Sequence, residues 1–520
     1  MKRIVYLLIF TSFLFSQNKR YIDFDEIDGP SFLLNSQKSF QSNFPPQLKK
    51  VKDPNISGGK ISDVTQRWPL QNNVDAASVP FMGPLDMAED ANGNLYISSP
   101  DLHVIRKVDT NGKITTFAGT GFQAWDGDGD LATKALFNGP HGLAFDASGN
   151  LYVADRTNHV VRKIDTNGII TTVAGKGGDS GFSGDGGPAT SAQIREPYDI
   201  VFDAAGNMYI SSYRRIRKVD TSGIISTIAG DGGESYRGEG GLATSATIAN
   251  PAHMVFDKSG KLYFADFGHH VVNVIDTDGK IYTVYGVGGS SGSSGDDPKR
   301  LNTPFGVAYE NRKIDARNED EELLYIMDYH NHVIIQLQLP SGGSTNAQRY
   351  TEAEILWGSE GDADFAGDGD SDWDETARFN QIENMITNFS ATSTNSKAVY
   401  HISDYANGRV RKIVEEETFA NNTDASSMST VAGTDIYNGT NIAANTARIY
   451  IPRNSAFDKN GNYFVADQGL HIIRKIDING IITTVAGTPG VSGFSGDGGA
   501  ATSAKINSPR GVTVDSKGNL

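Results

Sequence analysis

The amino-acid sequence predicts an all-β fold built from repeated four-stranded antiparallel units. Residues 142–175 contain four short apolar or alternating runs, at 142–145, 151–154, 160–164 and 169–173. Clusters of Asp, Asn and Gly separate these runs, which is the pattern of strands linked by tight turns. The unit recurs every roughly 53–57 residues where no insertion intervenes, and such a period with four strands per unit favours a β-propeller.

Two turns divide each unit. The turn before the second strand is Asp146–Gly149, and it returns at 90–93, 203–206, 257–260, 458–461 and 515–518. The turn before the fourth strand is Asp165–Gly168, and it returns at 109–112, 220–223, 276–279 and 477–480. The glycine that closes each turn can adopt the positive φ that other residues resist.

Seven complete repeats and part of an eighth follow one another along the chain. They begin near Pro84, Pro140, Pro197, Pro251, Pro304, Ile382, Pro452 and Pro509. The eighth stops at Leu520, in the middle of a strand, so we expect the sequence to be a C-terminally truncated fragment. Residues 59–64 resemble an isolated fourth strand. We therefore expect them to complete the blade that begins at Pro509, which would close a ring of eight blades.

The N-terminal segment has the form of a signal peptide. Lys2 and Arg3 precede an apolar run at 4–15, which is too short to span a bilayer comfortably. We expect cleavage near Ser16, a secreted, extracellular or periplasmic location, and no transmembrane segment in the mature chain. The alternative is a buried N-terminal strand. Residues 17–58 are predicted to be a polar linker, and 59–520 the propeller.

Composition excludes several classes of function. The chain has 520 residues, a net charge of −16 and no cysteine. The absence of cysteine excludes disulfides, a thiolate nucleophile and thiolate metal sites. The acidic balance, without a visible basic face, argues against a nucleic-acid partner. Neither a Gly-x-Ser-x-Gly elbow in a strand–turn–helix context nor a phosphate-binding loop is found.

The repeats resemble a known family. Asn-His-Val-like strings occur at 155–165, 329–336 and 469–477, and a longer inter-repeat segment occurs at 181–194 and 493–506. On these motifs the chain resembles NHL-repeat proteins of the bacterial secreted type. The resemblance implies a β-propeller, usually of six blades. It implies no single activity, because most members are binding or scaffold modules and a minority of related propellers are lyases or hydrolases.

Two recurring positions inside the repeats are assigned structural roles. One holds a histidine at the head of the third strand: His103, His159, His270, His332 and His471. Because the same slot of successive blades points to different places around a ring, these residues are expected to lie apart and not to form a metal site. The other holds an aspartate that ends the second strand, as at Asp155, and its carboxylate is expected to accept backbone N–H groups in the following turn.

The acidic inter-repeat loops offer a candidate calcium site. Alternating carboxylates on a flexible turn suit a hard cation, and they occur at Asp126, Asp128, Asp130, Asp368, Asp370 and Asp372. The EF-hand spacing fails, since Trp373 stands where glycine is required. Equivalent loops keep a single aspartate, at Asp185 and Asp497, which favours a turn residue over a ligand. Calcium binding is therefore the less favoured hypothesis for these loops, and no other cofactor is predicted.

The entry to each first strand is the candidate binding site. First strands line the central channel of a propeller, so residues just after the recurring proline gather at one mouth. These positions vary between repeats and include Asp86, His141, Asp199, His253, Arg453 and Arg510. Loops on a rigid ring are where binding usually occurs. The alternative is a solvated rim without a ligand.

The function expected from these features is that of a secreted, non-enzymatic binding or scaffold propeller for a protein, peptide or glycan partner. The alternative is a metal-assisted lyase or hydrolase at the channel mouth. It would use His141 and His253 together with Asp86 or Asp199. Two histidines and a carboxylate can hold a metal ion and leave a position open for substrate or water.

Overall fold

A computed structural model describes the fold. It covers residues 71–79, 83–292, 300–314, 319–339, 353–357, 379, 381–391, 395–405, 409–418, 423–432, 441–443, 452–458, 460–515 and 518–520. The chain divides into two compact units, one comprising Leu70–Asp435 and the other Met1–Pro69 with Ile436–Leu520. The described residues form seven antiparallel sheets, and none lies in an α-helix. This confirms the predicted all-β fold with four-stranded blades.

Six of the sheets belong to the unit at 70–435, and in each the strands follow chain order from the first to the fourth. The first three sheets consist of β2 (Met87–Glu89), β3 (Leu95–Ser99), β4 (Val104–Val108) and β5 (Lys113–Ala118); β6 (Pro140–Phe145), β7 (Leu151–Asp155), β8 (Val160–Ile164) and β9 (Ile170–Ala174); and β10 (Asp199–Phe202), β11 (Met208–Ser212), β12 (Arg215–Val219) and β13 (Ile225–Ala229).

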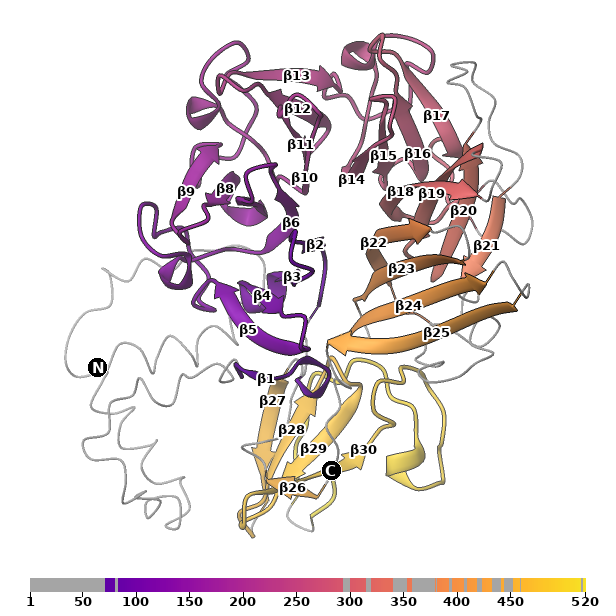
Figure 1. Cartoon of the computed structure of the whole chain (residues 1–520). Coiled ribbons are helices and arrows are strands. Elements are labelled where there is room, and N and C mark those ends of the chain that lie inside the picture. The colour runs from indigo at the N-terminus through magenta and orange to yellow at the C-terminus, as the bar shows by residue number, and fades with distance from the viewer. Residues whose placement is uncertain are drawn as a thin grey trace, which may run out of the picture. The chain divides into compact units, whose positions relative to one another are not determined.

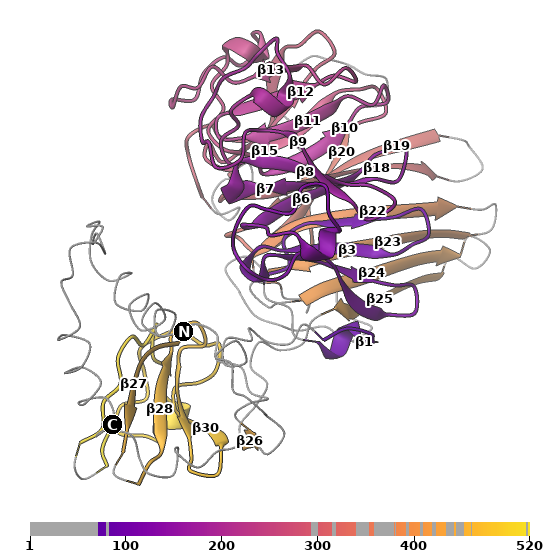
Figure 2. The same ribbon diagram turned by 90° about the vertical axis from the view of Figure 1, so that its left-hand side faces the viewer.

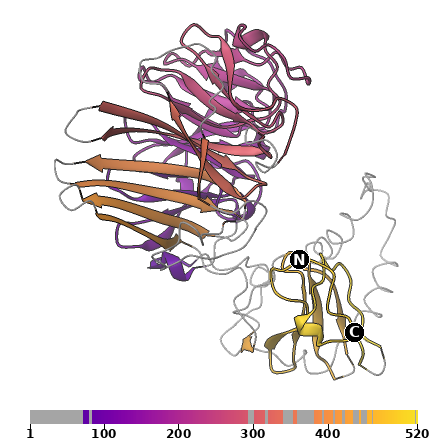
Figure 3. The same ribbon diagram turned by 90° about the vertical axis from the view of Figure 1, so that its right-hand side faces the viewer.

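The next three sheets consist of β14 (Pro251–Phe256), β15 (Leu262–Asp266), β16 (Val271–Ile275) and β17 (Ile281–Gly286); β18 (Pro304–Ile314), β19 (Glu319–Asp328), β20 (Val333–Leu339) and β21 (Ala353–Trp357); and β22 (Ile382–Ala391), β23 (Asn395–Asp404), β24 (Arg409–Thr418) and β25 (Thr423–Ala432). Strands β18, β19 and β22–β25 are longer than their counterparts and extend beyond them, as Figures 2 and 3 show.

The turns form as the sequence predicts. The Asp146 carboxylate accepts the backbone N–H groups of Ser148 and Asn150, both at 2.9 Å. Gly149 follows with a φ of +81°. Because one aspartate oxygen satisfies two backbone donors, this short loop fixes the register of the hairpin between β6 and β7 without help from the rest of the fold.

The six sheets close into a ring, with first strands β2, β6, β10, β14, β18 and β22 around its centre (Figure 1). Each pair of neighbouring sheets shares one hydrophobic cluster. The closing cluster joins Met87 and Ile97 of the first sheet to Val410 and Ala432 of the sixth. The expected closure with eight blades is therefore wrong for this unit, because the sixth sheet already covers the first. Residues 59–64 lie outside the described residues.

The inter-repeat segments run from one sheet to the outer edge of the next. The short 3₁₀ turns before the second, third and fourth sheets bury two alanines each, as Ala132 and Ala135 show. The Ala132 N–H donates to the Gly168 carbonyl at 2.8 Å, which ties the segment to the turn before β9. The short helices of the described chain are η4 (Ala76–Ser78), η5 (Pro100–Leu102), η6 (Ala132–Lys134), η7 (Arg156–Asn158), η8 (Ala189–Ser191), η9 (Ala243–Ser245) and η10 (Ala501–Ser503).

The seventh sheet belongs to the other unit. It contains β27 (Pro452–Phe457), β28 (Tyr463–Asp467), β29 (Ile472–Ile476) and β30 (Ile481–Ala486), with β26 (Ile442–Ala443) added beside β30. The first sheet carries the same addition, because β1 (Val74–Asp75) pairs with β5. Among the described residues, no helix is long and apolar enough to cross a membrane.

Candidate functional site

A cavity of about 460 Å³ runs through the centre of the six-sheet ring. Its walls come from the first strands of all six sheets, including Leu143, Ile200, Met254, Val307 and Met385. The expectation that first strands line the channel is confirmed.

One layer of the channel is polar. It is formed by the residue two positions after each repeat start, and we call it the polar ring: Asp86, Gly142, Asp199, His253, Gly306 and Asn384. The two glycines provide space, because a Cβ at Gly142 would lie 2.6 Å from the Cα of Asp199. The four side chains of the ring are at most 7% exposed.

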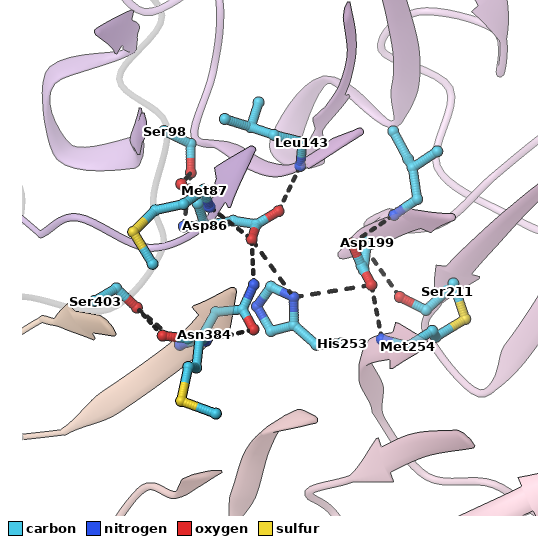
Figure 4. A network of polar contacts seen from close by, with 12 residues as sticks. Asp86, Met87, Ser98, Leu143, Asp199, Ser211, His253, Met254, Asn384 and Ser403 are labelled. Carbon is cyan, nitrogen blue, oxygen red and sulfur yellow. Dashed lines mark hydrogen bonds and ion pairs between the residues drawn. The ribbon is translucent and has the colours of Figure 1, made fainter. Parts of the chain in front are cut away.

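The carboxylates of the polar ring connect neighbouring sheets. Asp86 accepts the N–H of Met87 at 2.7 Å in its own sheet and that of Leu143 at 2.5 Å in the next (Figure 4). Asp199 accepts the N–H groups of Ile200 and Met254, each at 2.7 Å, in the same way. These contacts hold the entries of the first strands in a fixed arrangement.

Asn384 completes this arrangement where the sixth sheet meets the first. Its amide donates to Asp86 Oδ1, and its own Oδ1 accepts the N–H of Met385 at 2.7 Å. A side chain from the last sheet of the ring is thus bonded to a side chain of the first (Figure 4).

His253 lies between the two aspartates. Its Nδ1 atom is 3.9 Å from Asp86 Oδ1 and 3.8 Å from Asp199 Oδ2. Burial, reinforced by the charge of Asp86, raises the pKa of Asp199 well above its ordinary value. Burial lowers the pKa of His253, and the charge of Asp86 opposes this shift. Two acids and one imidazole therefore lie close together at buried positions of the channel wall.

The layer one residue before the polar ring forms the channel mouth, together with loops between second and third strands. The mouth residues are His141, Arg156, Tyr198, Phe267, Phe305, Tyr329 and Glu383. The Phe267 and Phe305 rings stack with centroids 5.3 Å apart, and Tyr329 lies 5.9 Å from Phe305. Tyr198 meets both phenylalanines edge-on. The three rings of Phe267, Phe305 and Tyr329 are half-buried.

Three polar atoms of the mouth are buried without a hydrogen-bond partner in the described part of the chain: Glu383 Oε2, His141 Nδ1 and Arg156 Nε. Burial raises the pKa of Glu383 well above its ordinary value. Burial also lowers the pKa of His141, helped by the charge of Arg156. The mouth thus combines a half-buried aromatic surface with unsatisfied polar groups, which a ligand could satisfy.

The predicted mouth residues divide into two groups. Asp86, His141, Asp199 and His253 gather at the channel of the six-sheet ring. Arg453 and Arg510 occupy the same slot of the repeat, but they belong to the other unit and are not among the first strands that line this channel. Arg453 lies in β27, and Arg510 is exposed.

The described aspartates of the calcium candidate are held by protein groups. Asp126 accepts the N–H of Gly127 at 2.7 Å, and Asp130 pairs with Lys134 at 3.0 Å. Asp128 lies 2.6 Å from the Nη2 atom of Arg162. These contacts suit turn residues, and the three carboxylates are not brought together as Asp86, Asp199 and His253 are. Asp368, Asp370 and Asp372 lie outside the described residues, and calcium stays a prediction.

The structural role predicted for the repeated histidines is confirmed. All five have a left-handed backbone, with φ between 55° and 62°. In each, Nδ1 accepts a backbone N–H from the segment that leads into the next repeat, as between His159 and Glu196 at 3.2 Å. The other four donors are Gly139, Thr303, Gln381 and Ser508.

We expect His159→Ala to lower the free energy of unfolding by about 1–3 kcal/mol, because the Glu196 N–H loses its acceptor in a partly buried position. His159→Asn should lose less, since asparagine tolerates the left-handed conformation. Urea denaturation of the purified variants measures both values. Equal stability of the wild type and the alanine variant would contradict this role.

The aspartates that end the second strand accept backbone N–H groups, as predicted. At Asp467 the donor is Leu470 of the following turn, at 3.3 Å, but at Asp155 and Asp328 donors come from before the first strand. Asp155 accepts the N–H of Asn138 at 2.8 Å, which lies before β6 and not in the turn after β7. Asp328 likewise accepts the N–H of Asn302 at 2.7 Å. Only a tertiary contact could reveal this partner, because it lies 17 residues away from Asp155 in the sequence.

Comparison with known proteins agrees with this architecture. A model of the teneurin NHL domain matches residues 120–181 and 176–237. Human Teneurin-1 is 25% identical over 277 residues, which is 46% of this chain and 10% of that protein. Drosophila melanogaster Teneurin-m is 30% identical over 260 residues, which is 44% of this chain and 9% of that protein. The chain thus spans about a tenth of the length of these curated relatives.

The chain contains an NHL-repeat β-propeller. The match to a solved streptogramin B lyase covers 79% of this chain and 95% of the lyase chain, with 13% identity and a TM-score of 0.38. The match to an auxiliary nutrient binding protein from Bacteroides ovatus covers 65% of this chain and 70% of that protein's chain, with 18% identity and a TM-score of 0.42. At these scores the solved structures carry no argument about the function of the NHL propeller.

Sequence reasoning missed the loop residues of the mouth of the NHL propeller. Arg156, Phe267 and Tyr329 each follow the aspartate that ends a second strand. An aromatic residue recurs at this position in the fourth, fifth and sixth repeats, where the residues are Phe267, Tyr329 and Tyr405. This recurrence was the signal in the sequence that could have revealed them.

Proposed function

We propose that the NHL propeller is a binding module that holds a segment of a protein partner in its channel mouth. The observation that supports this is the half-buried aromatic cluster of Phe267, Phe305 and Tyr329, in the same mouth as the buried Glu383 Oε2 atom that has no hydrogen-bond partner in the described part of the chain. Aromatic groups around buried polar groups are the usual anchors of binding surfaces. Export of the chain, expected from residues 1–16, is part of the same proposal.

The chemistry of the mouth favours a mixed apolar and polar ligand. An apolar side chain of the ligand would lie on the rings. Arg156 lies over Tyr198 at 4.5 Å and pairs with Glu196 at 2.5 Å, which offers a polar rim. The Glu383 carboxyl, whose pKa is raised by burial, would hydrogen-bond to a backbone group of the partner.

Phe305→Ala and Tyr329→Ala are each expected to weaken partner binding at least tenfold, because both residues belong to the half-buried aromatic cluster of the mouth. Screening the folded chain against peptide and glycan arrays identifies a ligand, and titration of the best hit measures the loss. Phe122→Ala is the matched control, since Phe122 is 57% exposed and lies outside the mouth.

Unchanged affinity in both mouth variants would contradict the proposal, as would an equal loss in Phe122→Ala. Capture of glycans alone, with no peptide bound, would replace the protein partner with a carbohydrate one. Thermal melting of all three variants shows whether a loss of binding reflects the mouth or the fold.

A metal-assisted lyase or hydrolase is the second candidate function. One observation favours it, namely the grouping of Asp86, Asp199 and His253 beside the cavity. His141, which the sequence hypothesis adds as a second imidazole, is not part of that group. The aromatic mouth does not require a metal, so the binding function is the better supported of the two.

A further inference from the structure

We propose that Asp86, Asp199 and His253 bind one divalent transition-metal ion, of which zinc is the expected example, inside the channel of the propeller. This site is separate from the proposed partner-binding function, and metal retention and partner capture can be measured independently. The three residues come from the first, third and fourth sheets, and the His253 side chain lies between the two aspartates inside the polar ring (Figure 4).

The spacing of the ligand atoms fits an ion that bridges them. The distances of 3.9 and 3.8 Å from His253 Nδ1 to the two carboxylates exceed those of a hydrogen bond. Two coordination bonds of about 2.0–2.2 Å each, meeting at a wide angle, span such a distance. One ligand atom from each of the three residues lies within 4.8 Å of the others. Two coordination bonds span at most about 4.4 Å, so the three side chains can reach a single ion as they stand or after a small inward shift.

The ligands are held in place before an ion arrives. Two backbone N–H groups fix each aspartate, and the Asn384 amide adds a further bond to Asp86. A carboxylate has about four lone-pair positions, so these bonds leave others for a metal. Outer hydrogen bonds of this kind orient metal ligands and tune their affinity.

Charge also favours an ion at this place. In the described part of the chain, the ion-pair contacts of Asp86 and Asp199 involve His253, and neither carboxylate contacts a lysine or arginine. Two buried carboxylates without a full positive charge beside them are costly. A divalent cation would supply that charge, with the imidazole neutral as a ligand.

The set of ligands points to the class of metal. Calcium prefers oxygen ligands alone, whereas an imidazole nitrogen with carboxylates suits zinc and related transition ions. Three protein ligands leave a fourth position, and the cavity adjoins it.

Zinc analysis of the tag-free full chain tests the proposal. The protein is incubated with zinc chloride and desalted, and its metal content is measured. We expect about one equivalent of zinc, bound at least tenfold more weakly in Asp199→Asn and in His253→Gln. His401→Gln is the matched control, because it removes a part-buried imidazole of β23 outside the group of Asp86, Asp199 and His253 and should retain zinc as the wild type does.

Cobalt replaces zinc in a second measurement, which does not depend on the folding of a variant. Co²⁺ in the wild-type chain is expected to give visible bands of a low-coordinate ion, and an excess of Zn²⁺ should abolish them. Absence of retained zinc in the wild type would overturn the proposal. Equal retention by a folded His253→Gln variant would do the same, because the metal would then lie elsewhere.

Discussion

Replacing Gly175 with alanine is expected to lower the free energy of unfolding by about 3–5 kcal/mol. Gly175 directly follows β9 and has a φ of +88°. A Cβ there would lie 2.3 Å from the His159 carbonyl oxygen and 2.9 Å from the Val160 Cα. Both are backbone atoms, so relief requires the start of β8 to move. Urea denaturation of the two proteins measures the difference.

Gly178→Ala provides the matched control for the cost of the backbone conformation alone. Its φ is +76°, and a Cβ there meets nothing within 4 Å. We expect a loss of about 1–2 kcal/mol, the cost of a left-handed conformation for a residue with a side chain. If both variants lost the same amount, the collision at Gly175 would not be the cause. The same contact recurs at Gly230, Gly286 and Gly487, so it belongs to the repeat itself.

The strands and turns could be predicted because their causes are local. The predicted run at 160–164 coincides with β8. The predicted run at 151–154 ends one residue before β7, which includes Asp155. One aspartate and one glycine determine each turn, and both stand within the turn itself. The alternation of apolar and polar residues then determines which face of the strand is buried.

Closure of the ring could not be predicted in this way. The sixth sheet packs on the first, and nothing in the sequence of the sixth repeat indicates this contact. The contacts that decide this, such as Asn384 with Asp86, join residues 298 positions apart. A repeat motif encodes one blade and its contact with the next blade. It does not encode the number of blades after which the ring closes.

The candidate site was predicted in part for the same reason. The shared position after the recurring proline predicted that Asp86, Asp199 and His253 lie together. They do so because all first strands of one ring face one channel. Arg453 and Arg510 share that slot but belong to a different unit. Phe267 and Tyr329 reach the mouth from another slot, so only the folded ring shows that the two positions meet.

Arg162→Met is expected to lower the free energy of unfolding by about 3–5 kcal/mol at pH 7. The Arg162 side chain is fully buried, and its Nη1 lies 3.7 Å from the equally buried Asp155 carboxylate. Methionine keeps most of the volume but leaves Asp155 without its cation. Lys134→Met is the control, since it breaks the exposed pair with Asp130 and should cost about 0.5 kcal/mol or less.

The pH dependence separates lost charge from lost packing in Arg162→Met. Burial raises the pKa of Asp155 from 3.8 to about 6, although hydrogen bonds and Arg162 oppose the shift. Because the folded pKa lies above the unfolded one, the native state binds the extra proton, and Asp155 lowers stability as the pH rises from about 4 to 6. Removing Arg162 should raise this pKa further. The deficit of Arg162→Met should therefore grow between pH 5 and pH 8 in urea denaturation, and a deficit independent of pH would mean that Arg162 acts through packing alone.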